Sequence, residues 1–162
     1  MEKRELVYYR LDKIDGKILD ILQGNARASL KEIAEQVFLS PTAVGARIDR
    51  MLQEGVLEGF TTRLNPEAMG HYIKAFINLE VQPEQREEFN EYIDGVLNVV
   101  ECNCVTGDFS MLIKVAFSDT MILDSFIGRL QKFGRTSTQI VFSTPVENRG
   151  VDVTAIDVSQ NP

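Results

Sequence analysis

The chain has 162 residues, of which 44% are hydrophobic and 25% charged, a composition typical of a globular protein and not of a disordered one. Its formal net charge of −7 argues against a surface coated with nucleic-acid-binding charge. Residues 1–63 hold as many basic as acidic side chains, so the whole acidic excess lies beyond residue 63. If the chain contacts DNA, we expect the first part to do so through a local cluster.

No apolar run approaches the ~18–20 residues of a membrane span, and the first residues lead into no signal-type apolar segment. We therefore expect a cytoplasmic protein with no membrane partner. Cys102 and Cys104 fit a reducing compartment. Because they lie one residue apart on a predicted strand, we expect small buried residues and no disulfide. His71 has no neighbouring ligands, so we expect neither a metal site nor a cofactor.

The first predicted helix ends at a Gln-Gly-Asn run at 23–25, which is typical of a helix terminus. Its apolar side chains recur at helical spacing and form one stripe: Leu11, Ile14, Ile18 and Leu22. Asp12 and Asp15 are expected on the polar face of this helix.

A second and a third helix follow, separated by a short turn. Ser29 and Glu32 have the spacing of a capping box, in which each side chain binds the backbone N–H of the other residue, so the second helix is predicted to begin there. The third is predicted to begin at Ser40, because serine is favoured at the N-cap and proline, here Pro41, at the first helical position. Gly55 fits its end. Three helices with a short turn between the last two are typical of a helix-turn-helix.

The outward face of the third helix is the strongest indication of function. Small side chains are unusual on an exposed face and allow another surface to approach closely: Ala43, Gly45 and Ala46. Arg47 and Arg50 lie three apart on one side, where phosphates or guanine edges are within reach. The alternative is that Arg50 pairs with Glu54 on a solvated face. The residues predicted to contact DNA are Ser29, Ser40, Pro41, Thr42, Ala43, Gly45, Arg47 and Arg50.

The rest of the chain alternates β-rich runs with amphipathic helices. Residues 56–64 are predicted to form a strand that leaves the DNA-binding domain, and residues 65–70 a turn with a short helical link. Further strands are expected at 73–81, 99–106, 111–117 and 136–144, and helices at 83–97 and 119–133. Asp119 is expected to cap the last helix and Gly134 to end it. Residues 151–158 are expected to add an edge strand or an exchanged tail.

The order β-α-β-β-α-β is that of a ferredoxin-like unit, a four-stranded antiparallel sheet with two helices on one face. We therefore predict an α+β chain with a winged helix-turn-helix domain at 1–62, a linker at 63–72 and a ferredoxin-like domain at 73–162. The other face of such a sheet needs a cover. A second copy is the simplest one, so a homodimer is expected.

Several motifs of the first half occur together: Leu11-Asp12-x-x-Asp15-x-x-Ile18-Leu19, Ile33-Ala34, Leu39-Ser40-Pro41-Thr42-Ala43-Val44-x-x-Arg47-Ile48-x-x-Met51, and Gly55-Val56. The combination resembles the Lrp/AsnC family, the leucine-responsive or feast/famine regulators of bacteria and archaea. The resemblance implies a DNA-binding transcriptional regulator.

The second half is similar to the same family's domain for regulation of amino-acid metabolism, through Val105-Thr106-Gly107-Asp108-Phe109-Ser110 and Thr136-x-Thr138-x-Ile140-Val141. The resemblance implies dimers that pair through the sheet, assemble to an octamer and hold an effector between them, often an amino acid. The implied effector-binding residues are Gly107, Asp108, Phe109, Ser110, Thr136 and Thr138. The family more often has an aspartate at Ser110, so a different effector, or none, is expected here. The alternative is that Gly107-Asp108 is only a tight turn.

The leading hypothesis is a transcription factor whose dimer reads two half-sites of double-stranded DNA about one helical turn apart. Because Gly45 and Ala46 offer few base-reading atoms, we expect loose sequence preference, with phosphate and shape contacts contributing heavily. The alternative is an amino-acid sensor that acts through protein partners. An enzyme is not expected, because the sequence shows no nucleophile–base pair, metal cluster or phosphate-binding glycine loop.

Overall fold

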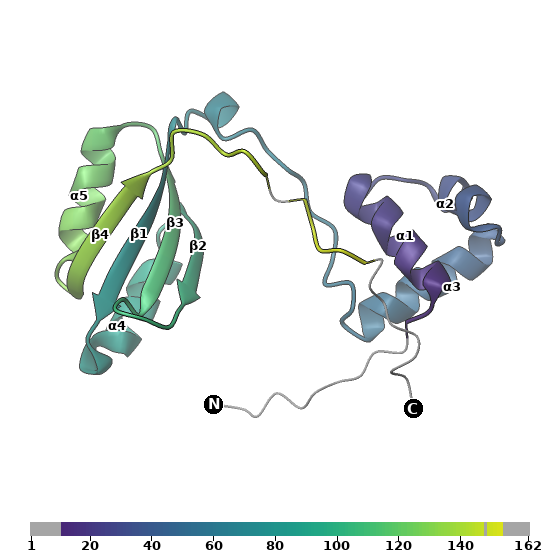
Figure 1. Ribbon diagram of the computed structural model, residues 1–162, viewed down its shortest axis with the longest axis horizontal. Coiled ribbons are helices and arrows are strands. Elements are labelled where there is room, and N and C mark those ends of the chain that lie inside the picture. The colour runs from purple at the N-terminus through teal and green to yellow at the C-terminus, as the bar shows by residue number, and fades with distance from the viewer. Residues whose placement is uncertain (1–10, 148, 154–162) are drawn as a thin grey trace. The chain divides into compact units, whose positions relative to one another are not determined.

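The computed structural model describes residues 11–147 and 149–153, which belong to two compact units. The first unit contains residues 11–62 together with the described residues between 146 and 153, and the second contains residues 63–145. The first unit is helical, and the second is a four-stranded sheet with helices packed against it (Figure 1).

The helical unit consists of the three predicted helices, α1 (Lys13–Gly24), α2 (Leu30–Val37) and α3 (Pro41–Gln53). Both predicted N-caps are confirmed. The Ser29 hydroxyl accepts from the backbone N–H of Glu32, and the Ser40 hydroxyl accepts from that of Ala43, each at 3.2 Å. The Glu32 carboxylate accepts from the Ser29 backbone at 2.7 Å, which completes the capping box. Gly55 follows α3 with a φ of 73°, as a helix-ending glycine does.

A second capping box lies at the start of α1, where the sequence predicted only polar surface. The Asp12 carboxylate accepts from the backbone of Ile14 and of Asp15, both at 2.8 Å, and the Asp15 carboxylate accepts from the Asp12 backbone at 3.0 Å. Asp15 is 1% exposed, so its predicted place on the polar face is wrong. The Ser-x-x-Glu pattern does not cover an aspartate pair, although its geometry is the same.

The core of the helical unit takes buried side chains from all three helices: Ile18, Leu19, Leu22, Ile33, Ala34, Val37, Val44, Ile48 and Met51. A later part of the chain joins it. The Gln23 side chain donates to the Val151 carbonyl at 3.1 Å and accepts from its N–H at 2.8 Å, and Val153 packs against the core. Residues 151–153 form no strand, and the rest of the predicted element 151–158 lies outside the described residues.

The strand predicted at residues 56–64 is wrong, because this segment is irregular. A strand forms only where a neighbouring backbone bonds to it, and none of the described strands pairs with this segment. The Leu57 N–H donates instead to the carbonyl of Met51 in α3. The short helical link is present as η1 (Glu67–Met69), which ends at Gly70 with a φ of 82°.

The second unit confirms the ferredoxin-like prediction. Its strands, all antiparallel, lie in the order β2-β3-β1-β4 (Figure 1) and span β1 (Ile73–Val81), β2 (Val99–Cys104), β3 (Met111–Phe117) and β4 (Gly134–Ile140). The helices are η2 (Pro83–Gln85), α4 (Arg86–Asp94) and α5 (Thr120–Leu130), the last capped by Asp119 as predicted. Gly134 begins β4, which starts and ends earlier than the predicted 136–144.

Alternate strand residues face the two helices and form the core of the sheet unit. In this layer Ile77 of β1 lies between Ile113 of β3 and Thr138 of β4, and Phe89 and Phe126 pack on it from α4 and α5. The same alternation places Cys102 and Cys104 opposite Ile113 and Met111, on the helix side of the sheet. Both cysteines are nevertheless exposed, so their predicted burial is wrong. Strand β2 is at the edge of the sheet, with a neighbouring strand on one side only.

Candidate DNA-binding surface and effector site

The start of α3 is open to solvent and carries short side chains. Ser40, Pro41 and Thr42 are exposed, and Ala43 is half-buried. The first N–H groups of a helix have no acceptor within the helix and favour an anion in front of them. Ser29, at the start of α2, is exposed in the same way. These predicted residues are therefore accessible, as a contact with a phosphate or a base edge requires.

Gly45 is on the side of α3 that faces α2, and not on the outer face where it was predicted. A Cβ atom built on Gly45 would lie 3.4 Å from Cδ1 of Leu30, and the residue is half-buried. Its lack of a side chain lets the two helices pack closely. The exposed small residue of this helix is the next one, Ala46.

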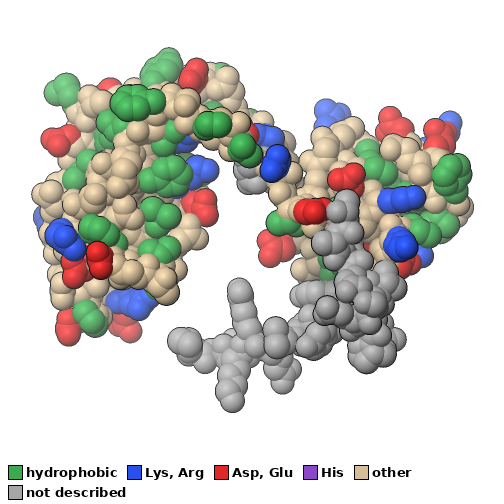
Figure 2. Space-filling model, viewed as in Figure 1, with side chains coloured by type: hydrophobic (Ala, Val, Ile, Leu, Met, Phe, Trp, Pro, Cys, Tyr) green, Lys and Arg blue, Asp and Glu red, His purple; other side chains and the backbone are tan. Residues whose placement is uncertain are grey.

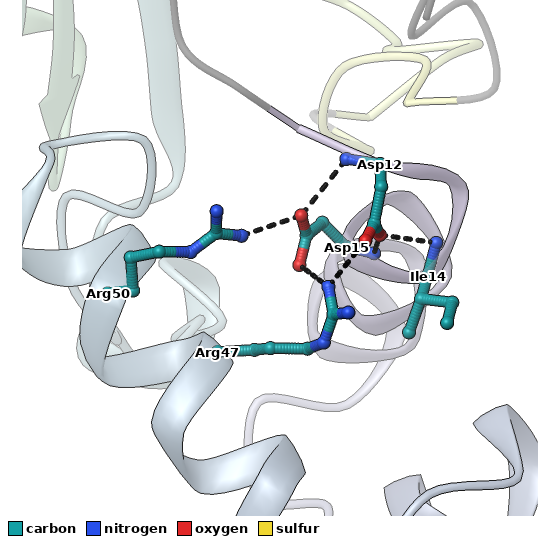
Figure 3. Close-up of polar contacts among 5 residues, drawn as sticks. All are labelled: Asp12, Ile14, Asp15, Arg47 and Arg50. Carbon is teal, nitrogen blue, oxygen red and sulfur yellow. Dashed lines mark hydrogen bonds and ion pairs between the residues drawn. The ribbon is translucent and has the colours of Figure 1, made fainter.

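The two arginines of α3 reach back to the start of α1. Nη1 of Arg47 lies 2.8 Å from the carboxylate of Asp12 and 2.7 Å from that of Asp15. Nη2 of Arg50 lies 2.6 Å from the other oxygen of Asp15. Figure 3 shows both guanidinium groups converging on the Asp15 carboxylate. The side chains of Arg47 and Arg50 are 28% and 37% exposed, so this cluster is sheltered on one side and open to solvent on the other.

The charges within this cluster stabilise one another. Burial opposes ionisation of Asp12, but hydrogen bonds from the Asp15 backbone and from Arg47 outweigh it and lower the pKa of Asp12. Hydrogen bonds to Asp12 and then to Asp15 raise the pKa of the Arg47 guanidinium. Figure 2 shows basic and acidic side chains interspersed on the visible face of the helical unit, in keeping with the balanced charge of residues 1–63.

The predicted effector loop joins β2 to β3, and its last residue is built into the sheet. The Ser110 hydroxyl accepts from the Val81 N–H at 3.0 Å and donates to the Leu79 carbonyl at 3.4 Å. Its backbone N–H also donates to the Leu79 carbonyl, at 3.1 Å. Ser110 therefore fastens the start of β3 to the end of β1, and its hydroxyl is already engaged. Gly107 has a φ of 113°, so the loop also needs a glycine to turn.

Two residues that sequence reasoning missed lie beside this loop. The Arg135 guanidinium lies 4.7 Å from the centre of the Phe109 ring, and its Nε lies 3.2 Å from the Glu80 carboxylate. Glu80 and Arg135 face each other across β1 and β4. The strand register brings them together, and a single sequence does not reveal that register.

Thr136 and Thr138 are on the helix-covered side of β4, opposite Leu79 and Ile77 of β1, and both are half-buried. Because Ser110 also bonds to Leu79, the structure brings the loop and Thr136 to the same end of the sheet. Thr138 lies one pleat further along β4.

A hollow of about 470 Å³ opens between α4 and the edge strand β2, and its lining includes none of the predicted effector residues. Arg86 and Asn90 line it from α4, and Cys102 and Cys104 from β2. An Arg86 N–H donates to the sulfur of Cys104 at 2.8 Å. Partial burial beside α4, and then the neighbouring Cys104, raise the pKa of the Cys102 thiol.

Among the residues that the structure describes, no three His, Cys, Asp or Glu side chains are grouped as metal ligands. None of the helices in the same part of the chain is long and apolar enough to cross a membrane.

Comparison with known proteins matches both units. Residues 11–52 match the AsnC-type helix-turn-helix domain, and residues 74–151 match the Lrp/AsnC ligand binding domain. The chain is 32% identical over 146 residues to the HTH-type transcriptional regulator FL11 of Pyrococcus furiosus, covering 88% of this chain and 97% of that one. It is 32% identical over 138 residues to the leucine-responsive regulatory protein of Escherichia coli, covering 81% and 84% of the two chains.

Solved structures agree with these matches. A transcriptional regulator from Neisseria meningitidis, in complex with L-methionine, has a TM-score of 0.80 at 26% identity and covers 85% of this chain and 93% of its own. The leucine response regulatory protein LrpA of Mycobacterium tuberculosis has a TM-score of 0.74 at 29% identity, and the match covers 87% of this chain and 99% of that one.

Proposed function

Because the chain belongs to the Lrp/AsnC family of DNA-binding transcriptional regulators, we propose that it binds double-stranded DNA through the first turns of α3 and the start of α2. The observation that carries this proposal is the exposed, small-sided start of α3 at Ser40, Pro41 and Thr42. A helix of this kind enters the major groove with its first residues against the base edges.

Each proposed contact has a distinct part in this surface. The N-terminal end of α3, with Ser40, Thr42 and Ala43, faces base edges and phosphates, while Ser29 at the start of α2 meets the phosphate backbone. Gly45 supports the surface from behind by letting α2 pack closely. The small side chains read few base atoms, so DNA shape and phosphate contacts supply much of the affinity.

The proposal is tested with the double variant Thr42→Asp/Ala46→Asp, titrated against a fluorescent promoter duplex. Both positions are exposed, so the fold tolerates the change, and two new carboxylates repel the DNA phosphates. We expect at least a tenfold loss of affinity, about 1.4 kcal/mol. Gln131→Glu adds negative charge to an exposed position of the other unit and is the control. Unchanged affinity in the double variant would favour the alternative, a sensor that acts through protein partners.

We further propose that an amino acid is the effector, bound by the second unit. The match to a ligand binding domain supports this assignment, as does the L-methionine bound to the Neisseria relative. Contacts come from the loop Gly107, Asp108 and Phe109, with Thr136 and Thr138 nearby on β4. Ser110 shapes the loop, because its hydroxyl is engaged by β1.

Thermal-shift screening of the twenty amino acids tests this assignment. A ligand that binds only the folded protein stabilises it by RT ln(1 + [L]/Kd) and so raises its melting temperature. We expect a shift for one or a few amino acids, lost in Asp108→Ala, an exposed loop position, and retained in Asp124→Ala on the exposed face of α5. No shift with any amino acid would contradict the effector assignment and leave DNA binding untouched.

We also propose a homodimer that assembles further to an octamer in the cytoplasm, where bacterial and archaeal DNA lies. The sheet face away from the helices supports this, because Phe76, Leu112 and Ala116 alternate with the buried residues of β1 and β3 and are only half-covered. Light scattering of the wild type and of Leu112→Glu tests it. We expect the variant to have a smaller mass; a monomeric wild type would contradict the assembly.

A further inference from the structure

The buried carboxylate of Asp15 occupies both arginines of the helix proposed to read DNA. One of its oxygens accepts from Arg47 at 2.7 Å, and the other accepts from Arg50 at 2.6 Å and from the Asp12 backbone at 3.0 Å. Asp12 adds a second carboxylate, 2.8 Å from Arg47. Among the residues drawn in Figure 3, two guanidinium groups thus meet two carboxylates.

Helical spacing places Arg50 on the DNA-facing stripe. Thr42, Ala46 and Arg50 follow one another at intervals of four residues, so their Cβ atoms share one face of α3. Thr42 and Ala46 are exposed, whereas the guanidinium of Arg50 turns aside to Asp15. Arg47, which adjoins Ala46 in sequence, is drawn to the same carboxylate.

A DNA phosphate cannot easily exchange for Asp15 in this cluster. Asp15 is 1% exposed, so an arginine that left for a phosphate would strand a carboxylate with little access to water. Breaking a buried ion pair by removing one partner is strongly destabilising, because the remaining charge is left uncompensated. The arginines therefore stay on Asp15 when α3 meets DNA.

From this geometry we infer that Asp15 is a positioning residue for sequence selectivity: it withholds Arg47 and Arg50 from the phosphates and so lowers affinity for random DNA. This inference rests on the proposed DNA contact of α3. Phosphate contacts by Lys and Arg supply essentially all non-specific affinity and set its dependence on salt. Because both arginines bind Asp15 and not phosphates, a larger share of the binding free energy comes from the exposed start of α3, which contacts the base edges.

The test compares full-length wild type with Asp15→Asn, which keeps the size of the side chain and removes its charge. Binding to a fluorescent random-sequence duplex and to a promoter duplex is measured at several salt concentrations. The variant is expected to show a slope of log affinity against log salt steeper by about 0.9 for each released arginine. The preference of the variant for the promoter duplex over the random-sequence duplex is expected to be smaller than that of the wild type. Asp20→Asn removes the same charge from an exposed position of α1 and keeps the wild-type slope.

The triple variant Asp15→Asn/Arg47→Gln/Arg50→Gln separates positioning from stability, because it removes both arginines together with the buried carboxylate and leaves only Asp12, whose side chain is 47% exposed, without its ion-pair partner. Its slope is expected to equal that of the wild type. A shallower slope would mean that the arginines already contact phosphates, and would overturn the inference. So would a folded Asp15→Asn, checked by circular dichroism, that binds more weakly without a steeper slope. A wild type that binds neither duplex would instead contradict the DNA contact itself.

Discussion

The carboxylate of Asp15 lies 2.7 Å from the guanidinium of Arg47, and this contact joins the first helix of the chain to the third. Because Asp15 is 1% exposed, the loss of a partner leaves its charge poorly solvated. We expect Arg47→Met to lower the free energy of unfolding of the helical unit by about 2–4 kcal/mol, since Arg50 still compensates part of the charge. This loss is measured by denaturant unfolding of the wild type and the variant, followed by circular dichroism.

The matched control is Arg135→Met in the other unit. Arg135 also pairs with a carboxylate, that of Glu80, but the two side chains are 64% and 44% exposed. Water and salt screen such pairs, so the expected loss is at most about 1 kcal/mol. Equal losses in the two variants would show that burial of Asp15 does not set the strength of its ion pairs.

Gly134 is expected to tolerate no side chain. A Cβ atom there would lie 1.8 Å from the carbonyl oxygen of Glu80, which belongs to the neighbouring strand and has no room to move. We expect Gly134→Ala to destabilise the sheet unit by more than about 2 kcal/mol, measured by denaturant unfolding. Gly128 in α5 has nothing within 4 Å of the corresponding position. Gly128→Ala is therefore expected to stabilise the protein by about 0.5–1 kcal/mol.

Phe38 ends α2 in a left-handed conformation, with φ 57° and ψ 44°, and its side chain is 89% exposed. This conformation costs a residue with a Cβ atom about 1–2 kcal/mol, and glycine avoids the cost. We expect Phe38→Gly to raise the free energy of unfolding by about 1 kcal/mol. Phe38→Ala keeps the strained backbone and removes only the exposed ring, so it should change stability by less than about 0.5 kcal/mol. A gain of equal size in both variants would assign the effect to the ring.

Acid is expected to destabilise the helical unit through its two capping boxes. The hydrogen bond from the Ser29 backbone lowers the pKa of Glu32, and the Asp12 pKa is lowered as well. A carboxyl whose pKa is lower in the folded state stabilises it above the unfolded pKa, and this contribution is lost as the pH falls. The melting temperature should therefore fall below about pH 4, where unfolded carboxyls titrate.

Glu32→Gln checks the origin of this acid effect. Glutamine can still accept from the Ser29 backbone, as in the general form of the motif, but it does not titrate. Its melting temperature is expected to fall less between pH 5 and pH 3 than that of the wild type. A curve parallel to the wild type would exclude Glu32 as a source of the acid sensitivity.

Local patterns were sufficient to predict most of the fold. Ser29 with Glu32, and Ser40 with Pro41, mark helix starts because each satisfies backbone N–H groups within one turn of its own position. The strand β1 and the strand β3 were predicted at the residues where they occur, since alternation of buried and exposed residues is also a short-range property. The order of these elements was then enough to identify the ferredoxin-like sheet.

Features that depend on distant residues were not predictable in the same way. Asp15 looked like a surface residue because nothing nearby in sequence reveals that Arg47 and Arg50 fold back onto it. Cys102 and Cys104 have the alternation of a buried strand, but the position of β2 at the sheet edge exposes them. Ser110 was predicted to contact an effector, and only its bonds to β1 show that its hydroxyl is engaged within the sheet.

The starts of α2 and α3 could be read from local sequence, because caps and apolar spacing act within a few residues. The side chains that the exposed face of α3 presents depend instead on packing between distant parts of the chain. Its arginines are as visible in the sequence as its small residues, but the direction of each guanidinium depends on a carboxylate more than thirty residues away. Electrostatic attraction at close range acts between neighbours in space, and the packing of α1 against α3 makes Asp15 that neighbour.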